Sequence, residues 1–222
     1  IIVGAGSETD TVNGPISFSA GSGMTPEIMA ITLLLGGPDA DYEKVFAEKI
    51  VWVKGMSGSE RRLAFRRGDL AATRENPAAY KKHVEPVIAE GKAYTWFHHG
   101  LLDVATGNHV KDPNFTEPTL EALYEERWGV APSGDFYDAY KLVKSWRDAL
   151  QKAFWVNAGN PNKDKLVDAL NKMLMDPDSV AAIEKKVGKY EWRTGVDGDN
   201  AVKTLKTFIT PEALKTLSLI HI

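Results

Sequence analysis

The stretch Pro15-Ile-Ser-Phe-Ser-Ala-Gly-Ser-Gly-Met-Thr-Pro-Glu-Ile-Met-Ala30 decides how this chain of 222 residues folds. It opens with a short apolar run at 16–20, typical of a β-strand, and continues through a loop of small residues at 21–23. A helix follows, because Thr25 suits the N-cap, Pro26 the first helical position and Glu27 the positive first turn. The stretch therefore predicts a strand, a glycine loop and a helix in succession.

A glycine loop that leads into a helix N-terminus exposes backbone N–H groups, which attract an anion such as phosphate or a carboxylate. The alternative is a tight connection that binds nothing. A second turn of the same kind follows: a strand at 50–53, a Gly/Ser loop at 54–59, a helix capped by Ser57 or Ser59, and a third strand at 69–73. In a parallel α/β sheet both loops lie at the carboxyl ends of the strands, where ligands bind.

Composition describes an ordinary folded protein and excludes several classes of site. Hydrophobic residues make up 43% of the chain and the formal net charge is −3, which does not favour a nucleic-acid surface. The chain has no cysteine, so disulfides, thiolate metal sites and cysteine nucleophiles are excluded. A cluster of arginines on the predicted helix at 60–67 is interpreted as a solvated helix face; its members are Arg61, Arg62, Arg66 and Arg67.

Two further patterns suggest sites that the spacing does not support. The opening Ile1–Ser7 contains Gly-x-Gly after an apolar run, but it lacks the third glycine of a dinucleotide fingerprint, and Asn13-Gly14-Pro15 breaks the chain before a helix could form. Histidines at 98, 99 and 109 lie near Asp103, yet adjacent histidines on a strand point to opposite faces, so solvent-exposed or packing histidines are favoured over a metal site.

The remaining elements follow from apolar spacing, helix caps, glycines and prolines. Strands are expected at 93–97 and 154–156, and 108–119 is expected to be loop. Helices are expected at 28–35, 41–49, 77–90 with a break near Pro86, 120–127, 136–153, 163–175, 177–187, 200–208 and 211–217.

The order of several segments resembles that of the substrate-binding proteins of tripartite tricarboxylate transporters, a family of periplasmic carboxylate receptors. The segments that carry the resemblance are Phe18-Ser-Ala-Gly-Ser-Gly23, Val51-Trp-Val-Lys-Gly-Met-Ser-Gly-Ser-Glu60, the Arg-Gly-Asp ending of 63–70, Asp112-Pro-Asn-Phe-Thr-Glu-Pro-Thr-Leu-Glu121 and Asn157-Ala-Gly-Asn-Pro161. The chain departs from the family pattern at Asn157, where the family has proline, and in lacking the first strand and its loop.

This resemblance implies an α/β protein with a two-lobed, class II periplasmic-binding-protein-like fold, incomplete at the N-terminus. Residues 15–148 would form the α/β lobe with the Gly/Ser loops, and residues 1–14 and 149–216 would form the remainder of the other lobe. Residues 217–222 are expected to be a non-native tail.

The two loops and the resemblance together predict a receptor that captures a mono-, di- or tricarboxylate without being an enzyme, and that needs no cofactor and no metal. The expected ligand-binding residues are Ser19, Ala20, Gly21, Ser22, Gly23, Met24, Thr25, Ser57, Gly58, Ser59, Asp69 and Thr73. Arg74 is either a partner for a second carboxylate or a surface residue. The alternatives are a serine-dependent hydrolase or transferase and a phosphate- or nucleotide-binding module.

The expected partners, besides the carboxylate, are the membrane permease subunits of the transporter. The expected location is the periplasm, although the chain shows no signal peptide. A monomer and no nucleic-acid partner are expected.

Overall fold

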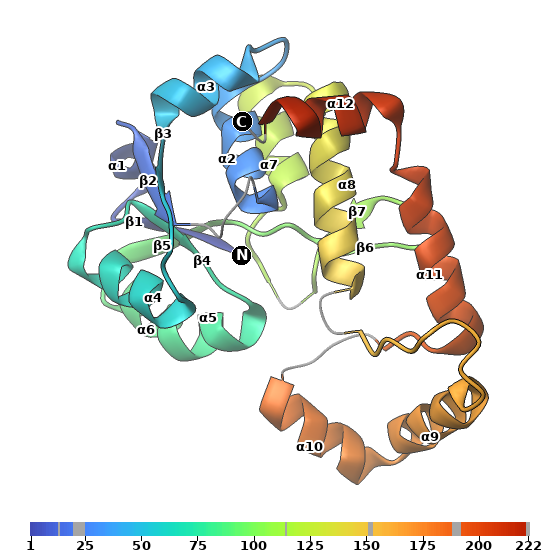
Figure 1. Cartoon of the computed structure of the whole chain (residues 1–222). Helices are drawn as coiled ribbons and strands as arrows, with labels where there is room; N and C mark the ends of the chain where they lie inside the picture. Colours follow the sequence, from blue (N-terminus) through green and yellow to red (C-terminus); the bar gives the residue numbers. More distant parts are fainter. Residues whose placement is uncertain (13, 20–24, 114, 151–152, 188–191, 221–222) are drawn as a thin grey trace.

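The fold is known from a computed structural model, which describes residues 1–12, 14–19, 25–113, 115–150, 153–187 and 192–220. It is a mixed α/β protein built around a five-stranded sheet of order β3-β2-β4-β1-β5 (Figure 1). The strands are β1 (Ile2–Ala5), β2 (Ile16–Ser19), β3 (Ile50–Val53), β4 (Ala72–Arg74) and β5 (Ala93–Phe97). The α/β class expected from the sequence is confirmed.

The sheet is parallel except at one interior strand. β2 pairs in parallel with β3 and with β4, whereas β1 lies antiparallel between β4 and β5. The strand at 2–5, expected in a different lobe from 15–148, is instead hydrogen-bonded inside this sheet. Gly4 is close-packed there: a Cβ at this position would lie 2.3 Å from Cε1 of Tyr94.

Helices cover both faces of the sheet. One face carries α2 (Pro26–Gly36), α3 (Tyr42–Lys49), α7 (Leu120–Trp128) and α8 (Asp135–Leu150), and the other carries α4 (Gly58–Arg67), α5 (Pro77–His83) and α6 (Glu85–Ala89) (Figure 1). The side chains of β1 alternate between the two cores, with Ile2 in the first and Val3 in the second.

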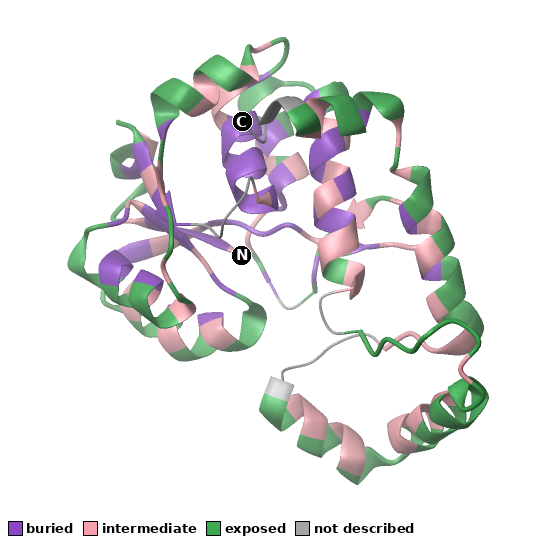
Figure 2. Ribbon diagram, in the orientation of Figure 1, coloured by how far each residue is buried: buried purple, intermediate pink, exposed green. Residues whose placement is uncertain are grey.

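The helix signals in the sequence are confirmed at the predicted positions. Thr25 is the N-cap of α2 and Pro26 its first residue, and every residue from Pro26 to Leu34 is buried, as the purple ribbon in Figure 2 shows. Ser57 caps α4, which ends at Gly68 with φ 82°, a left-handed conformation that glycine adopts without strain.

Some local predictions were wrong. A short helix, α1 (Glu8–Val12), forms before the Asn-Gly-Pro break, and Ser7 begins it by hydrogen bonding with Asp10. The loop expected at 108–119 contains β7 (His109–Val110), which pairs with β6 (Leu101–Leu102) in a small ribbon. No strand forms at Phe154–Val156, which is exposed. The third parallel strand, expected at 69–73, is β4, which begins at Ala72 and ends at Arg74.

Four helices follow α8 in the chain: α9 (Lys163–Met175), α10 (Pro177–Val187), α11 (Gly195–Thr207) and α12 (Pro211–Ile220). α11 and α12 pack against α8, and Ala213 of α12 is buried in the main core. α9 and α10 form a hairpin that extends away from the sheet and has no buried residue among those described (Figures 1 and 2).

The helices beyond α8 also contribute to the core beside the sheet. Part of 149–216 contributes to the same core as the sheet, and outside the five-stranded sheet the described residues form the β6–β7 ribbon and a single parallel bridge between His98 and Thr119. α12 includes Leu217–Ile220, and Leu217 packs against the main core. That residues 217–222 are a non-native tail stays a prediction. No helix in the described ranges is both long and apolar enough to cross a membrane.

Burial of α2 predicts that a leucine-to-alanine substitution destabilises the protein far more in α2 than on the exposed surface of α4. Leu34 of α2 is 0% exposed, whereas Leu63 of α4 is 54% exposed. Leu34→Ala leaves a cavity and should lower the free energy of unfolding by about 2–5 kcal/mol, while Leu63→Ala should change it by less than about 0.5 kcal/mol. Urea denaturation of the two variants measures both values, and similar losses would contradict the burial of α2.

Candidate functional site

The strand order predicts a ligand site at the carboxyl ends of β2 and β4. The chain runs from β2 outward to β3 and then crosses back to β4 on the other side of β2, with α2 and α3 on one face and α4 on the other. In open α/β sheets, ligands bind where the strand order changes direction in this way. Ser19 ends β2 and Arg74 ends β4, so these residues mark the candidate site.

Two residues of the first predicted loop reach this edge with unused hydroxyls. Ser19 is 0% exposed, and its hydroxyl has no hydrogen-bond partner in the described part of the chain. Thr25 is the N-cap of α2, but its side chain makes no capping hydrogen bond; its buried Oγ1 has no partner of good geometry there, although it is near enough to the Glu27 carboxylate to lower its pKa. Ala20, Gly21, Ser22, Gly23 and Met24 lie outside the described residues.

The second predicted loop serves first as a helix cap. The Ser57 hydroxyl accepts a hydrogen bond from the Glu60 backbone N–H at 3.3 Å, and the Glu60 carboxylate accepts one from the Ser57 N–H at 2.8 Å. Ser57 and Ser59 are exposed and Gly58 is half-buried. A Cβ on Gly58 would lie 3.7 Å from Nη2 of Arg62, so this loop borders the arginines described below.

The structure separates Asp69 from Thr73. Asp69 lies in the turn before β4, where its carboxylate pairs with Arg67 at 2.6 Å, so it belongs to the amino end of the strand. Thr73 lies near the carboxyl end, is 1% exposed, and has a hydroxyl without a partner among the described residues. Because β2 and β4 pair through Phe18 and Ala72, Thr73 is the cross-strand neighbour of Ser19.

A buried carboxylate joins this edge to helix α8. Oε1 of Glu27, a residue only 6% exposed, lies 3.3 Å from Nη1 of Arg74 and 2.5 Å from Nη1 of Arg147. Burial acts to raise the pKa of Glu27, but the two guanidinium groups outweigh it and lower that pKa below its usual value. Arg74 is thus neither a simple surface residue nor free.

A second buried carboxylate lies on the other face of β4. Glu75 accepts two hydrogen bonds from Arg62, from Nε at 2.9 Å and from Nη2 at 3.4 Å, and Nη2 of Arg61 lies 3.8 Å from its Oε1. Arg61 also donates to the Arg74 carbonyl oxygen at 3.1 Å. The expectation that the arginines of α4 form a solvated face was therefore wrong for Arg61, which is 8% exposed and turned toward the sheet.

These two groups carry more positive than negative charge. Each joins one carboxylate to two guanidinium groups, which leaves a surplus of two positive charges over the set. Nε of Arg61 and Nε of Arg74 are buried and donate to nothing in the described ranges. Lys144 of α8, whose pKa burial lowers to about 7, pairs with Asp148.

The histidines pack in the interior. His98 contacts Phe115 and His99 contacts Tyr140, so the two rings lie on opposite faces as predicted. The described residues contain no group of three or more acidic or histidine side chains that could hold a metal ion.

His109 links a serine to a carboxylate: Nε2 lies 3.2 Å from Oγ of Ser145, and Nδ1 lies 3.4 Å from Oε1 of Glu121. This order of groups is that of a serine hydrolase, but Ser145 is 0% exposed in the middle of α8, where no substrate could reach it.

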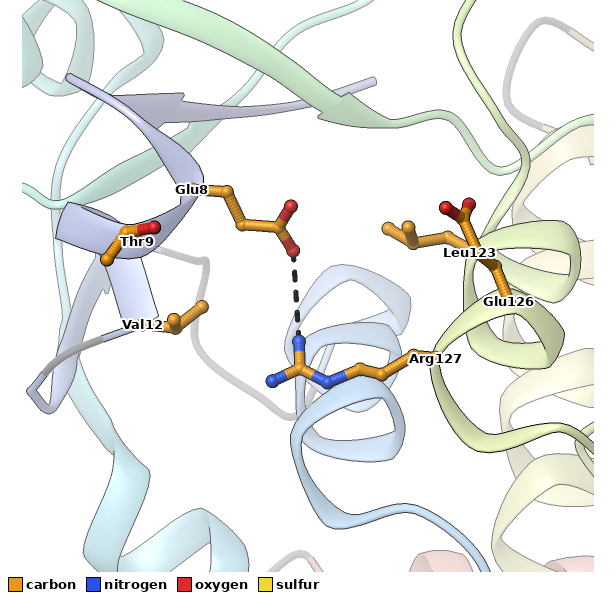
Figure 3. Close-up of a pocket in the computed structure, with 6 residues that line it drawn as sticks. All are labelled: Glu8, Thr9, Val12, Leu123, Glu126 and Arg127. Carbon is orange, nitrogen blue, oxygen red and sulfur yellow. Dashed lines mark ion pairs between the residues drawn. The ribbon is translucent and has the colours of Figure 1, made fainter.

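A pocket of about 370 Å³ lies at the opposite edge of the sheet, between α1 and α7 (Figure 3). Glu8 faces Arg127 across it at 3.8 Å, and Trp96 donates to Glu8 at 3.1 Å. Glu8 is thus already paired with two protein groups, and none of the predicted ligand residues lines the pocket.

Sequence reasoning missed Glu27, Glu75 and Arg147 as members of the site. Glu27 was interpreted only as a favourable first-turn residue. One signal could have found it: α2 is apolar on all sides, so a charged residue within it must be buried and needs a charged partner. The partner itself, Arg147, lies 120 residues away and follows no local pattern.

Comparison of the chain with protein-family models, with curated proteins and with solved structures gave no match.

Burial of the histidines predicts that the protein loses stability on mild acidification. Burial lowers the pKa of His98, His99 and His109, so they stay neutral in the folded state below pH 6.5, where the unfolded chain binds protons. The free energy of unfolding should therefore be highest above pH 7 and fall as the pH drops through 6.5, by up to about 1.4 kcal/mol per pH unit for each extra proton. Urea denaturation between pH 7.5 and 5.5 measures the slope, which His109→Gln should reduce. A free energy of unfolding that does not change over this pH range would contradict the prediction.

Proposed function

We propose that this chain binds an organic carboxylate at the carboxyl edge of its sheet, as a non-enzymatic solute-binding protein. Two observations support this: the surplus of guanidinium over carboxylate groups at that edge, and the buried, unpartnered hydroxyls of Ser19 and Thr73 near the carboxyl ends of β2 and β4. An anion placed there would meet positive charge and hydrogen-bond donors together.

Physical chemistry favours an anion over a neutral ligand. A buried hydroxyl without a partner costs about 1–3 kcal/mol, and a ligand oxygen that accepts from it removes this cost. Guanidinium groups match the planar shape of a carboxylate with two parallel N–H bonds. The N-terminus of α2 adds the positive end of a helix dipole, and the site is partly open, since the side chains of Arg74 and Arg147 are 28% and 27% exposed.

The finer parts of the proposal rest on the resemblance to the receptors of tripartite tricarboxylate transporters. On this proposal a second lobe closes over the carboxylate, the closed form is presented to the membrane permease subunits, and the protein acts in the periplasm without a cofactor or metal. Closure would follow from ligand contacts made only in the closed state.

A matched pair of threonine substitutions tests the site. Thr73→Val removes an unpartnered hydroxyl and should leave the ligand-free free energy of unfolding equal or higher, while weakening carboxylate binding by about tenfold or more. Thr32 is equally buried, but its hydroxyl donates to the Ile28 carbonyl oxygen at 2.8 Å inside α2, so Thr32→Val should leave binding unchanged. Calorimetric titration with acetate, succinate and citrate measures the affinities.

The same titrations separate the alternatives. Binding of inorganic phosphate in preference to every carboxylate would indicate a phosphate-binding module instead. Chemical conversion of a bound ligand would show that the protein is an enzyme. If none of these anions binds to the full chain, the proposed function is wrong.

A further inference from the structure

Glu27 lies where an anionic ligand would be expected, which raises the question of what it does there. It is the second residue of α2, at the positive end of the helix, and its Oε1 already contacts both Arg74 and Arg147. Its Oε2 is buried and accepts no hydrogen bond of good geometry in the described part of the protein, although the nearby Thr25 hydroxyl helps to lower the pKa of the carboxylate. A carboxylate that served only to hold the two arginines would be expected to use both oxygens, as Glu75 does with Arg62.

The charge balance gives Glu27 a second role. With Glu27 and Glu75 both ionised, the two ion-pair groups retain two positive charges; without Glu27 they would retain three. The carboxylate therefore lowers the positive potential that an incoming anion meets. Because the energy of an anion in a given potential is proportional to its charge, this potential acts twice as strongly on a dianion as on a monoanion.

We propose that Glu27 is a specificity-determining residue: an internal counter-ion that limits how strongly this edge binds anions and sets its preference for a doubly charged ligand over a singly charged one of the same size. This inference rests on the proposed function, since it concerns the same site. Arg147 has the opposite effect on the potential, because it brings one of the surplus positive charges to the site from α8.

Two substitutions, one that removes a negative charge and one that removes a positive charge, distinguish this role from a structural one. Glu27→Gln keeps the shape of the side chain and removes a negative charge, so it should tighten binding of a dicarboxylate by about tenfold and of its monoamide by about threefold. Arg147→Gln should weaken the same two ligands, again with the larger change for the dicarboxylate. If Glu27 only maintained the local structure, both variants would weaken binding.

The probes are malonate, succinate and glutarate, each compared with its monoamide, which has nearly the same size and one charge fewer. Titrations of the full chain at low salt and at 1 M salt give the affinities, and the difference between each pair should shrink at high salt, since added ions screen partly exposed charges. Glu43→Gln is the matched control: Glu43 is exposed on α3, and its substitution changes the net charge equally but should leave affinities unchanged.

The outcomes separate the two proposals. If a dicarboxylate and its monoamide bind equally well, or if Glu27→Gln weakens both, the role of Glu27 is refuted while carboxylate binding stands. If no probe binds, both proposals fail. Should Glu27→Gln not fold, the Arg147→Gln arm decides alone, since equal weakening of dicarboxylate and monoamide would overturn the inference.

Discussion

The contact between Glu27 and the two arginines, Arg74 and Arg147, ties together three parts of the fold that are distant in sequence. Glu27 lies at the start of α2, Arg74 at the end of β4 and Arg147 in α8. Burying a carboxylate is costly, and removing one partner of a buried ion pair typically costs about 3–5 kcal/mol because the remaining charge is left uncompensated. The relative positions of the sheet edge and α8 thus depend on this contact.

The same contact explains why a helix as apolar as α2 has one defined position. The hydrophobic effect has no direction of its own, so burial places a helix only through the fit of its side chains. Glu27 adds a directional contact, because its carboxylate meets both guanidinium groups. The hydrophobic effect therefore buries α2, while the charged contact fixes its register and brings its N-terminus to the carboxyl ends of β2 and β4.

Local signals in the sequence predicted much of the fold, and long-range contacts account for the rest. β3, β5, α9 and α10 occur with the predicted bounds, because apolar spacing, prolines and glycines act within a few residues. The location of β1 depends instead on hydrogen bonds to β4 and β5, and the inward turn of Arg61 depends on Glu75.

The candidate site also contains residues that local signals predict and residues that only long-range contacts bring together. Ser19 and Thr25 could be placed from the sequence because Ser19 ends β2 and Thr25 caps α2, and Thr73 because it lies in the apolar run of β4. The arginine and glutamate pairs could not, because each joins residues that are adjacent only after folding.

The antiparallel strand β1 has a consequence for how the protein is made. Residues 2–5 leave the ribosome before their hydrogen-bond partners, which are residues 72–74 and 93–97. Until those partners are synthesised, β1 is an unpaired apolar strand, and β4 and β5 have unpaired edges until it inserts between them. The sheet therefore has high contact order, and we expect its closure to be a slow step that follows synthesis of β5. During that interval the nascent chain exposes strand edges that can pair with other chains, so the interior location that makes β1 stable once folded also makes the unfinished protein prone to aggregate.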